Sequence, residues 1–182
     1  TYTAEQGSRP AIEWLADALA HPDRAAQRQV FRIDHPDLLS MLGLATGEGG
    51  RKRFSFDELQ PKFQEIAKQS ERASNIPAKQ QDPFQRAVLD LHQRLSIYID
   101  INRMDSPYAL APLAQGEEWR PLSAAATNQA AASSLALASY REILTAYSND
   151  DPTGFNAAVA KYLSLLAERL PAEVRRAGYE VG

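Results

Sequence analysis

A long amphipathic stretch near the middle of the chain constrains the fold most. The residues DPFQRAVLDLHQRLSIYIDI, from Asp82 to Ile101, open with an Asp-Pro pair and place Gln85 three residues after the aspartate. An aspartate at the N-cap with proline in the first turn is a strong helix start. Apolar side chains then recur at the spacing of one helix face, and they are Phe84, Val88, Leu91, Leu95 and Tyr98. This stretch therefore predicts a long helix at the centre of the core.

Helix-start and helix-stop signals recur along the rest of the chain, and proline often marks the boundary. The expected helices cover residues 12–21, Pro36 to Gly43, Pro61 to about Ala73, Ser123 to about Tyr147, Asp151 onward, and a short last segment from Pro171. The first and the fifth of these have apolar faces of Ile12, Leu15, Ala16 and Leu19, and of Phe155, Val159, Tyr162, Leu163 and Leu166.

The triplet Asp34-His35-Pro36 admits a structural and a chemical interpretation. Asp34 is a good N-cap, because its carboxylate can accept hydrogen bonds from free backbone N–H groups. Pro36 falls in the first turn, where its missing N–H costs little, and Gly43 is a natural stop. A helix start accounts for the whole triplet, so a local backbone role is the prediction for His35.

Two short apolar stretches, VFRI at residues 30–33 and RFSF at residues 53–56, are candidate strands that can pair across this helix. The expected fold class is all-α: an irregular helical bundle of about five to seven helices, with at most one short two-stranded β ribbon. We expect a single helical domain over residues 1–182, and the abrupt start and end suggest a fragment cut from a longer protein.

Composition excludes several classes of function. The 182 residues include 44% apolar residues, which suffices for one sizeable core, and the formal net charge is -3. Without a basic excess, no nucleic-acid partner is expected. The chain contains no cysteine, which excludes disulfides, thiolate metal sites and a cysteine nucleophile within it. No apolar run reaches the roughly 18 residues of a membrane span, so we expect a chain that does not span the bilayer.

The three histidines, His21, His35 and His92, do not fall in a metal-ligand pattern such as H-x-x-x-H. His92 lies beside the central stripe and is predicted to be a half-buried structural residue. His21 precedes a proline at a helix end, where its cationic form would suit the helix dipole. We therefore predict no catalytic residue, no cofactor ligand and no metal site. The alternative hypothesis is an independent soluble helical enzyme that uses a histidine/carboxylate site.

Two loops supply the candidate interaction surface. They contain Trp119 and Arg120, in a proline-rich connection, and the basic run Arg51-Lys52-Arg53. Trp and Arg are enriched at binding hot spots. The competing interpretations are structural: Trp119 fills the core where its loop returns, and the basic run is a solvated loop end.

Several stretches resemble a known family. AIEWLADALAHPDRAAQRQVFRIDHPDLLSMLGL, RKRFSFDEL, the central helix segment and WRPLS look like the large hydrophilic insert of System II cytochrome c assembly membrane proteins. These are the ResB/ResC (CcsA/CcsB) type, in the long fused versions of some bacteria. VFRIDHPDLLSMLGL is the most specific piece, and the resemblance covers most of the chain.

The resemblance implies an extracytoplasmic interaction or scaffold domain of a c-type cytochrome assembly protein, non-catalytic by itself. Such inserts lie on the periplasmic face of the bacterial cytoplasmic membrane, as part of an integral membrane protein. The implied partners are other segments of the parent membrane protein and apocytochrome c. Docking the apocytochrome, guarding the haem exit and bracing the parent's halves stay open as roles.

Haem is handled by the parent in this family, through a Trp-rich loop and histidine ligands outside the insert. Neither feature is present in this sequence. We therefore expect no cofactor in this chain, and none of His21, His35 and His92 is assigned as a haem ligand.

Overall fold

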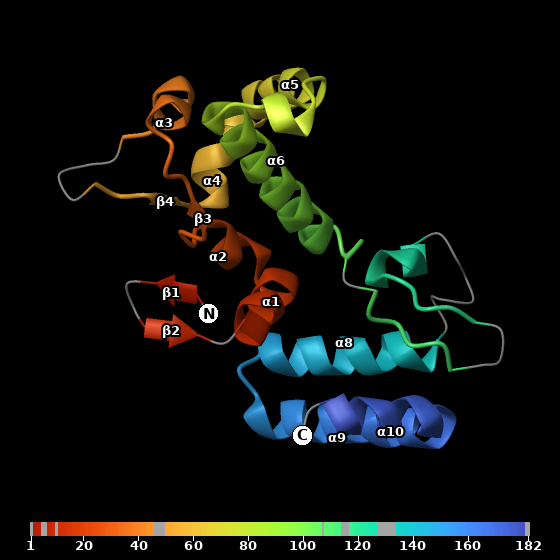
Figure 1. Cartoon of the computed structure of the whole chain (residues 1–182). Coiled ribbons are helices and arrows are strands. Elements are labelled where there is room, and N and C mark those ends of the chain that lie inside the picture. The colour runs from red at the N-terminus through yellow and green to blue at the C-terminus, as the bar shows by residue number, and fades with distance from the viewer. Residues whose placement is uncertain are drawn as a thin grey trace. The chain divides into compact units, whose positions relative to one another are not determined.

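The computed structural model describes residues 2–4, 7–9, 11–45, 50–106, 108–113, 117–126 and 134–180. Over these residues the fold is an all-α irregular bundle with short two-stranded ribbons, which confirms the expected fold class. Contacts divide the chain into two compact units, one of residues 1–18 and 22–99 and one of residues 19–21 and 100–182. The single domain expected over residues 1–182 stays a prediction, and each unit is described by itself (Figure 1).

Helices dominate the order of elements along the chain. The elements up to the central helix are β1 (Tyr2–Ala4), β2 (Gly7–Arg9), α1 (Ala11–Ala20), α2 (Pro22–Ala26), β3 (Phe31–Arg32), α3 (Pro36–Leu42), β4 (Arg53–Phe54), α4 (Phe56–Leu59), η1 (Gln60–Lys62), α5 (Phe63–Ser74), η2 (Ala78–Gln80) and α6 (Pro83–Asn102). The remaining elements are η3 (Leu122–Ala126), α8 (Leu135–Ser148), α9 (Pro152–Arg169) and α10 (Pro171–Glu180).

The predicted ribbon is present. β3 pairs antiparallel with β4, with Phe31 opposite Phe54, and the N–H of Ile33 donates to the carbonyl of Lys52 at 2.8 Å. Phe31, Ile33 and Phe54 are buried while Arg32 is exposed, as the alternation of a half-buried strand requires. A second ribbon, β1 with β2, was not expected from the sequence.

The core of the first unit forms around α6, as its apolar stripe predicts. Asp82 and Gln85 cap its start reciprocally: the Gln85 N–H donates to Asp82 Oδ1 at 2.8 Å, and the Asp82 N–H donates to Gln85 Oε1 at 3.0 Å. The buried members of this core are Phe31, Ile33, Leu38, Leu39, Leu42, Phe54, Leu59, Ile66, Val88, Leu91, Leu95 and Tyr98. The ribbon and α3 are therefore held against one face of α6.

The segment after β4 starts a helix earlier than predicted. Ser55 and Glu58 form a complete capping box, so α4 begins at Phe56, ahead of the helix start expected at Pro61. Pro61 then lies in the 3₁₀ turn η1, and α5 follows from Phe63. The short 3₁₀ turn places the proline where its missing N–H breaks no α-helical hydrogen bond.

The second unit is built on α8 and α9, which lie side by side in Figure 1. Asp151 caps α9 as predicted, accepting from the Gly154 N–H at 2.9 Å. The helix that was expected to start at Ser123 is α8, but Ser123 lies in η3. Ser134 caps α8 instead, by accepting from the Leu137 N–H. Residues 127–133 of the expected helix lie outside the described residues. The buried core of this unit is Ala109, Leu110, Leu122, Ala136, Leu137 and Tyr162.

Two residues that the sequence placed on apolar helix faces are exposed. Ile12 of α1 is 68% exposed and Leu163 of α9 is 58% exposed. The buried part of α1 instead includes Asp17 and Ala18, and Tyr162 is the buried neighbour on α9. The periodicity of apolar residues identifies the apolar face of a helix, but it does not tell how much of that face other elements cover.

Alkaline pH is expected to weaken the second unit through a tyrosine pair. Tyr140 and Tyr162 meet edge to face at 5.3 Å between ring centroids. Burial, followed by the neighbouring Tyr140, raises the pKa of Tyr162 to about 12. The contribution of the neutral Tyr162 phenol to the free energy of unfolding is complete below about pH 10. It is lost as pH rises toward 12, because only the phenol of the unfolded chain ionises in this range. The total loss is at most about 3 kcal/mol. Denaturant titration across this range checks the slope, and Tyr162→Phe should flatten it; an equal slope in both proteins would contradict the assignment.

Candidate functional site

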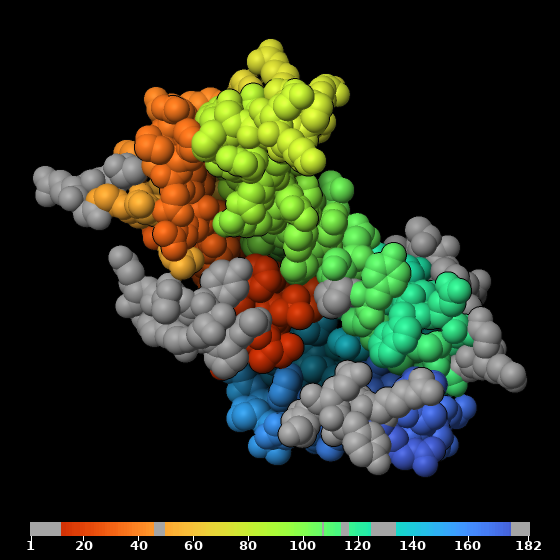
Figure 2. Space-filling model, in the orientation of Figure 1, coloured from red at the N-terminus to blue at the C-terminus, as the bar shows by residue number. Residues whose placement is uncertain are grey.

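A groove of about 410 Å³ lies in the first unit between the β3–α3 segment and α6. Figure 2 shows α3, in orange, packed beside the first turns of α6, in green. The groove is lined by residues of both walls: Arg32, Ile33, Asp34, His35, Pro36, Leu38, Ala87, Asp90, Leu91 and Arg94. The most specific piece of the sequence, residues 30–44, therefore builds one wall.

The floor of the groove is apolar and rigidly packed. Ile33, Leu38 and Leu91 are 3%, 1% and 2% exposed and belong to the core of the unit. Side chains in such a core are close-packed and sit in rotamer minima, so we expect the floor to keep its shape when a partner binds.

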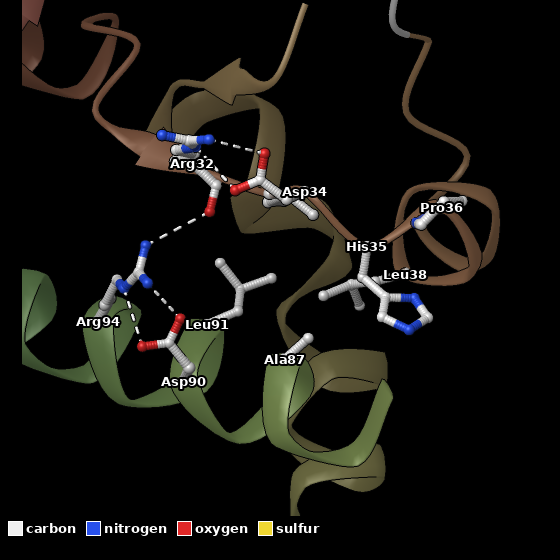
Figure 3. Close-up of a pocket in the computed structure, with 10 residues that line it drawn as sticks. Arg32, Asp34, His35, Pro36, Leu38, Ala87, Asp90, Leu91 and Arg94 are labelled. Carbon is white, nitrogen blue, oxygen red and sulfur yellow. Dashed lines mark hydrogen bonds and ion pairs between the residues drawn. The ribbon is translucent and has the colours of Figure 1, made fainter. Parts of the chain in front are cut away.

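The rim on the β3 side carries a three-residue ion network. Arg32 Nε lies 2.7 Å from Asp34 Oδ2 (Figure 3). Lys52 Nζ lies 3.2 Å from Asp34 Oδ1. The hydrogen bond from Arg32 holds the pKa of Asp34 below its ordinary value, and Lys52 adds to this effect. Asp34 is therefore an ionised structural anion and a weak base. This role replaces the N-cap that was predicted for it.

The opposite rim is formed by Asp90 and Arg94, one turn apart on α6. Arg94 Nε donates to Asp90 Oδ1 at 3.1 Å, and a second guanidinium nitrogen contacts Asp90 Oδ2. The remaining nitrogen, Nη1, donates to the backbone carbonyl of Arg32 at 3.4 Å. Figure 3 shows these contacts joining the two walls at one end of the groove. The charges of both rims are about half exposed, so they remain available to a partner.

His35 occupies the N-cap of α3, in an extended conformation with φ -77° and ψ 120°, and makes no side-chain cap hydrogen bond. Its ring meets Phe84 edge to face at 5.7 Å. Nδ1 is buried and has no hydrogen-bond partner among the residues that the structure describes. In Figure 3 the imidazole lies at the other end of the groove from the Asp34 and Asp90 carboxylates. The backbone carbonyl of His35 accepts from the Leu39 N–H at 3.1 Å, and the predicted lack of a functional role for its side chain stays a prediction.

The other two histidines lie on different elements. His92 stacks on Phe63 with 5.8 Å between centroids and is half-buried, as predicted. His21 lies between α1 and α2 in the chain and contacts the Tyr147 ring at 6.0 Å. Across the described ranges, no group of three or more His, Asp or Glu residues could hold a metal ion.

The basic run of the candidate interaction surface is used partly within the fold. Arg51 Nη2 lies 2.5 Å from Glu58 Oε1, and its guanidinium sits 4.8 Å from the Phe54 ring centroid. Burial raises the pKa of Glu58, but hydrogen bonds from Ser55 and Arg51 outweigh burial and leave the pKa below its ordinary value. Arg53 lies in β4 and Lys52 completes the Asp34 network. Arg51 and Lys52 thus support the groove.

Trp119 and Arg120 lie in the second unit. Leu110 and Arg120 exchange backbone hydrogen bonds of 2.9 and 3.1 Å, and Arg120 Nη2 lies 3.1 Å from Glu117 Oε1. Trp119 is 50% exposed, so the interpretation that it fills the core is wrong. Trp119 lies directly before Arg120, the residue that pairs with Leu110, and its side chain is exposed where the sequence was expected to place it in the core.

Sequence reasoning did not single out Arg32, Asp90 or Arg94. The i,i+4 spacing of Asp90 and Arg94 was a usable signal for a fixed charge pair on the helix surface. The contact between Arg94 and Arg32 forms only because the ribbon packs against α6. No local sequence pattern predicts that packing.

Comparison with protein-family models, curated proteins and solved structures finds no match to this chain. None of the described helices is long and apolar enough to cross a membrane. What the groove can do chemically therefore follows from its residues: it offers an apolar floor with paired charges at the rims. This arrangement suits binding of an amphipathic segment better than proton transfer, because both carboxylates are held by arginine.

Proposed function

We propose that this chain is an extracytoplasmic interaction domain of a c-type cytochrome assembly protein, and that the groove beside α6 receives a segment of its partner. The observation that carries the proposal is where the resembling segments lie. VFRIDHPDLLSMLGL, RKRFSFDEL and the α6 segment pack together in one unit and build the groove or its support. The partner is a segment of apocytochrome c. The periplasmic location and the haem-handling parent follow from the resemblance.

The charged rims support a docking role. Exposed ion pairs contribute only about 0–1 kcal/mol to folding, so they can exchange partners at little cost. Charge complementarity mainly sets association rate and register, while the apolar floor supplies affinity. A segment with alternating charged and apolar side chains fits both features.

Charge reversal at the rims tests this role. The double variant Arg32→Glu/Arg94→Glu is expected to bind immobilised apocytochrome c about tenfold more weakly than the wild-type chain, with the loss mainly in association rate. Surface plasmon resonance at two salt concentrations measures both effects. The matched control is Lys161→Glu/Arg169→Glu, which reverses two exposed ion-paired cations of α9. Equal binding by both variants would argue against the groove, and no binding by the wild type would argue against the partner.

The alternative, a helical enzyme, is favoured by one observation: His35 lines the same groove as two carboxylates. A general acid or base contributes about 10²–10⁴ in rate, so His35→Gln should abolish turnover in that case. Under the interaction proposal, the effect of His35→Gln is confined to the strength of apocytochrome binding.

A further inference from the structure

The end of α6 has an unusual residue at its turn. The Met104 N–H donates to the Ile101 carbonyl at 2.9 Å and the Asp105 N–H donates to the Asp100 carbonyl at 2.8 Å. This is the helix-ending pattern that favours glycine at the left-handed position. Met104 occupies that position with φ 61°.

At two other helix ends, the left-handed position is occupied by a residue type that commonly adopts this conformation. Gly43 ends α3 with the same pair of hydrogen bonds and φ 61°. Asp150, a residue type that tolerates this conformation, ends α8 with φ 51°. A methionine there is strained, and a strained residue that persists points to a use for its side chain.

Met104 lines a groove of about 340 Å³ in the second unit, a volume within the usual range of small-molecule sites. Leu122 and Leu137 form a buried floor, while Tyr140 and Leu144 are half-buried walls. The N–H of Ser123 donates to the Met104 carbonyl at 3.0 Å, which ties η3 to the strained turn. The flexible thioether of methionine adapts to varied apolar ligands.

A single cation stands at the edge of this groove. Arg141, on α8, is exposed and has no ion-pair or hydrogen-bond partner among the described residues. The nearby Lys161, in contrast, is held by both oxygens of Glu142 at 2.9 Å. An apolar groove with one uncommitted guanidinium is complementary to an aliphatic chain that carries one carboxylate.

We propose that the groove of Met104, Leu137, Leu144 and Arg141 binds a small amphipathic carboxylate, with its chain over the floor and its head on Arg141. Met104 covers the chain, and this contact explains its retention at a position suited to glycine. The site lies in the second unit and does not depend on the docking groove beside α6.

Calorimetric titration of the full chain with dodecanoate, below its micelle concentration, tests the site. We expect one saturable site with a Kd on the order of 10–100 µM. Dodecanol and the Arg141→Gln variant should each weaken binding about three- to tenfold, because both remove one half of the charge contact. Lys161→Gln is the matched control and should leave the Kd unchanged, since that cation serves the fold.

Met104→Gly separates a ligand contact from a structural role. The variant should lower dodecanoate affinity at least about threefold, while the melting temperature holds or rises by about 2 °C because the left-handed strain is relieved. The proposal is overturned by any of three results: no saturable binding, equal affinity for dodecanol and dodecanoate, or unchanged affinity in Arg141→Gln.

Discussion

Replacing both Arg24 and Arg28 with methionine is expected to lower the free energy of unfolding of the first unit by about 3–5 kcal/mol. Asp17, on α1, is 1% exposed and is the buried anion that these two arginines neutralise. Arg24 Nη2 lies 3.3 Å from Asp17 Oδ1, and Arg28 pairs with Asp17 Oδ2. Without both cations the buried carboxylate loses its two ion pairs with arginine, and breaking ion pairs to a buried charge costs far more than an exposed ion pair is worth.

A rescue variant makes this prediction specific. Adding Asp17→Leu to the double arginine variant removes the buried carboxylate that has lost its two arginine partners, and should recover most of the lost stability. Urea unfolding of the single, double and triple variants gives the free energy of unfolding of each, and from these the coupling between Asp17 and the two arginines. Asp23→Ala, at an exposed position on α2, is the control and should change stability by less than about 0.5 kcal/mol. A loss under about 1 kcal/mol in the double variant, or no recovery in the triple, would show that the pair is not the anchor of α1 and α2.

Phe54→Ala is expected to cost about 3–5 kcal/mol, because it empties the largest fully buried side chain of the first unit. Phe54 lies in β4 opposite Phe31, has 0% exposure, and carries the Arg51 guanidinium over its ring. Its loss opens the space between the ribbon and α6 that shapes the groove floor. Guanidinium unfolding followed by circular dichroism measures the change.

The control for Phe54 is Ile97→Ala, since Ile97 lies on α6 but is 49% exposed. This variant should cost less than about 1 kcal/mol. Similar losses for the two variants would mean that the ribbon and α6 do not form one cooperative core.

Local signals predicted several elements well, because the chemistry that makes them is itself local. Asp82 with Gln85, Asp151 with Gly154, and Gly43 all act where the residue order placed them. A capping side chain reaches a backbone group only two or three residues away, so order along the chain is sufficient. The pairing of β3 with β4 was also predictable, from the apolar character of both segments.

Errors arose where a residue had competing partners. Asp34 could cap α3, but Arg32 and Lys52 hold its carboxylate, so His35 takes the N-cap position. In the alanine- and serine-rich segment, Ser134 starts α8, and the earlier Ser123 belongs to η3. Each choice depends on tertiary contacts that weigh more than local preference.

The candidate site itself depended on long-range packing. Nothing near Asp17 in the sequence marks it as a buried anion, and the groove joins Arg32 to Arg94 across 62 positions. Met104 has no sequence signal either, because its left-handed conformation depends on how α6 ends.

The most direct test of the proposed function is cytochrome c maturation in cells that depend on the full-length protein containing this chain. The measurement is the yield of covalently attached haem on c-type cytochrome. Arg32→Glu/Arg94→Glu in the parent should lower that yield at least about tenfold, whereas Lys161→Glu/Arg169→Glu should leave it unchanged. A normal yield from a parent that lacks residues 11–180 would contradict the account.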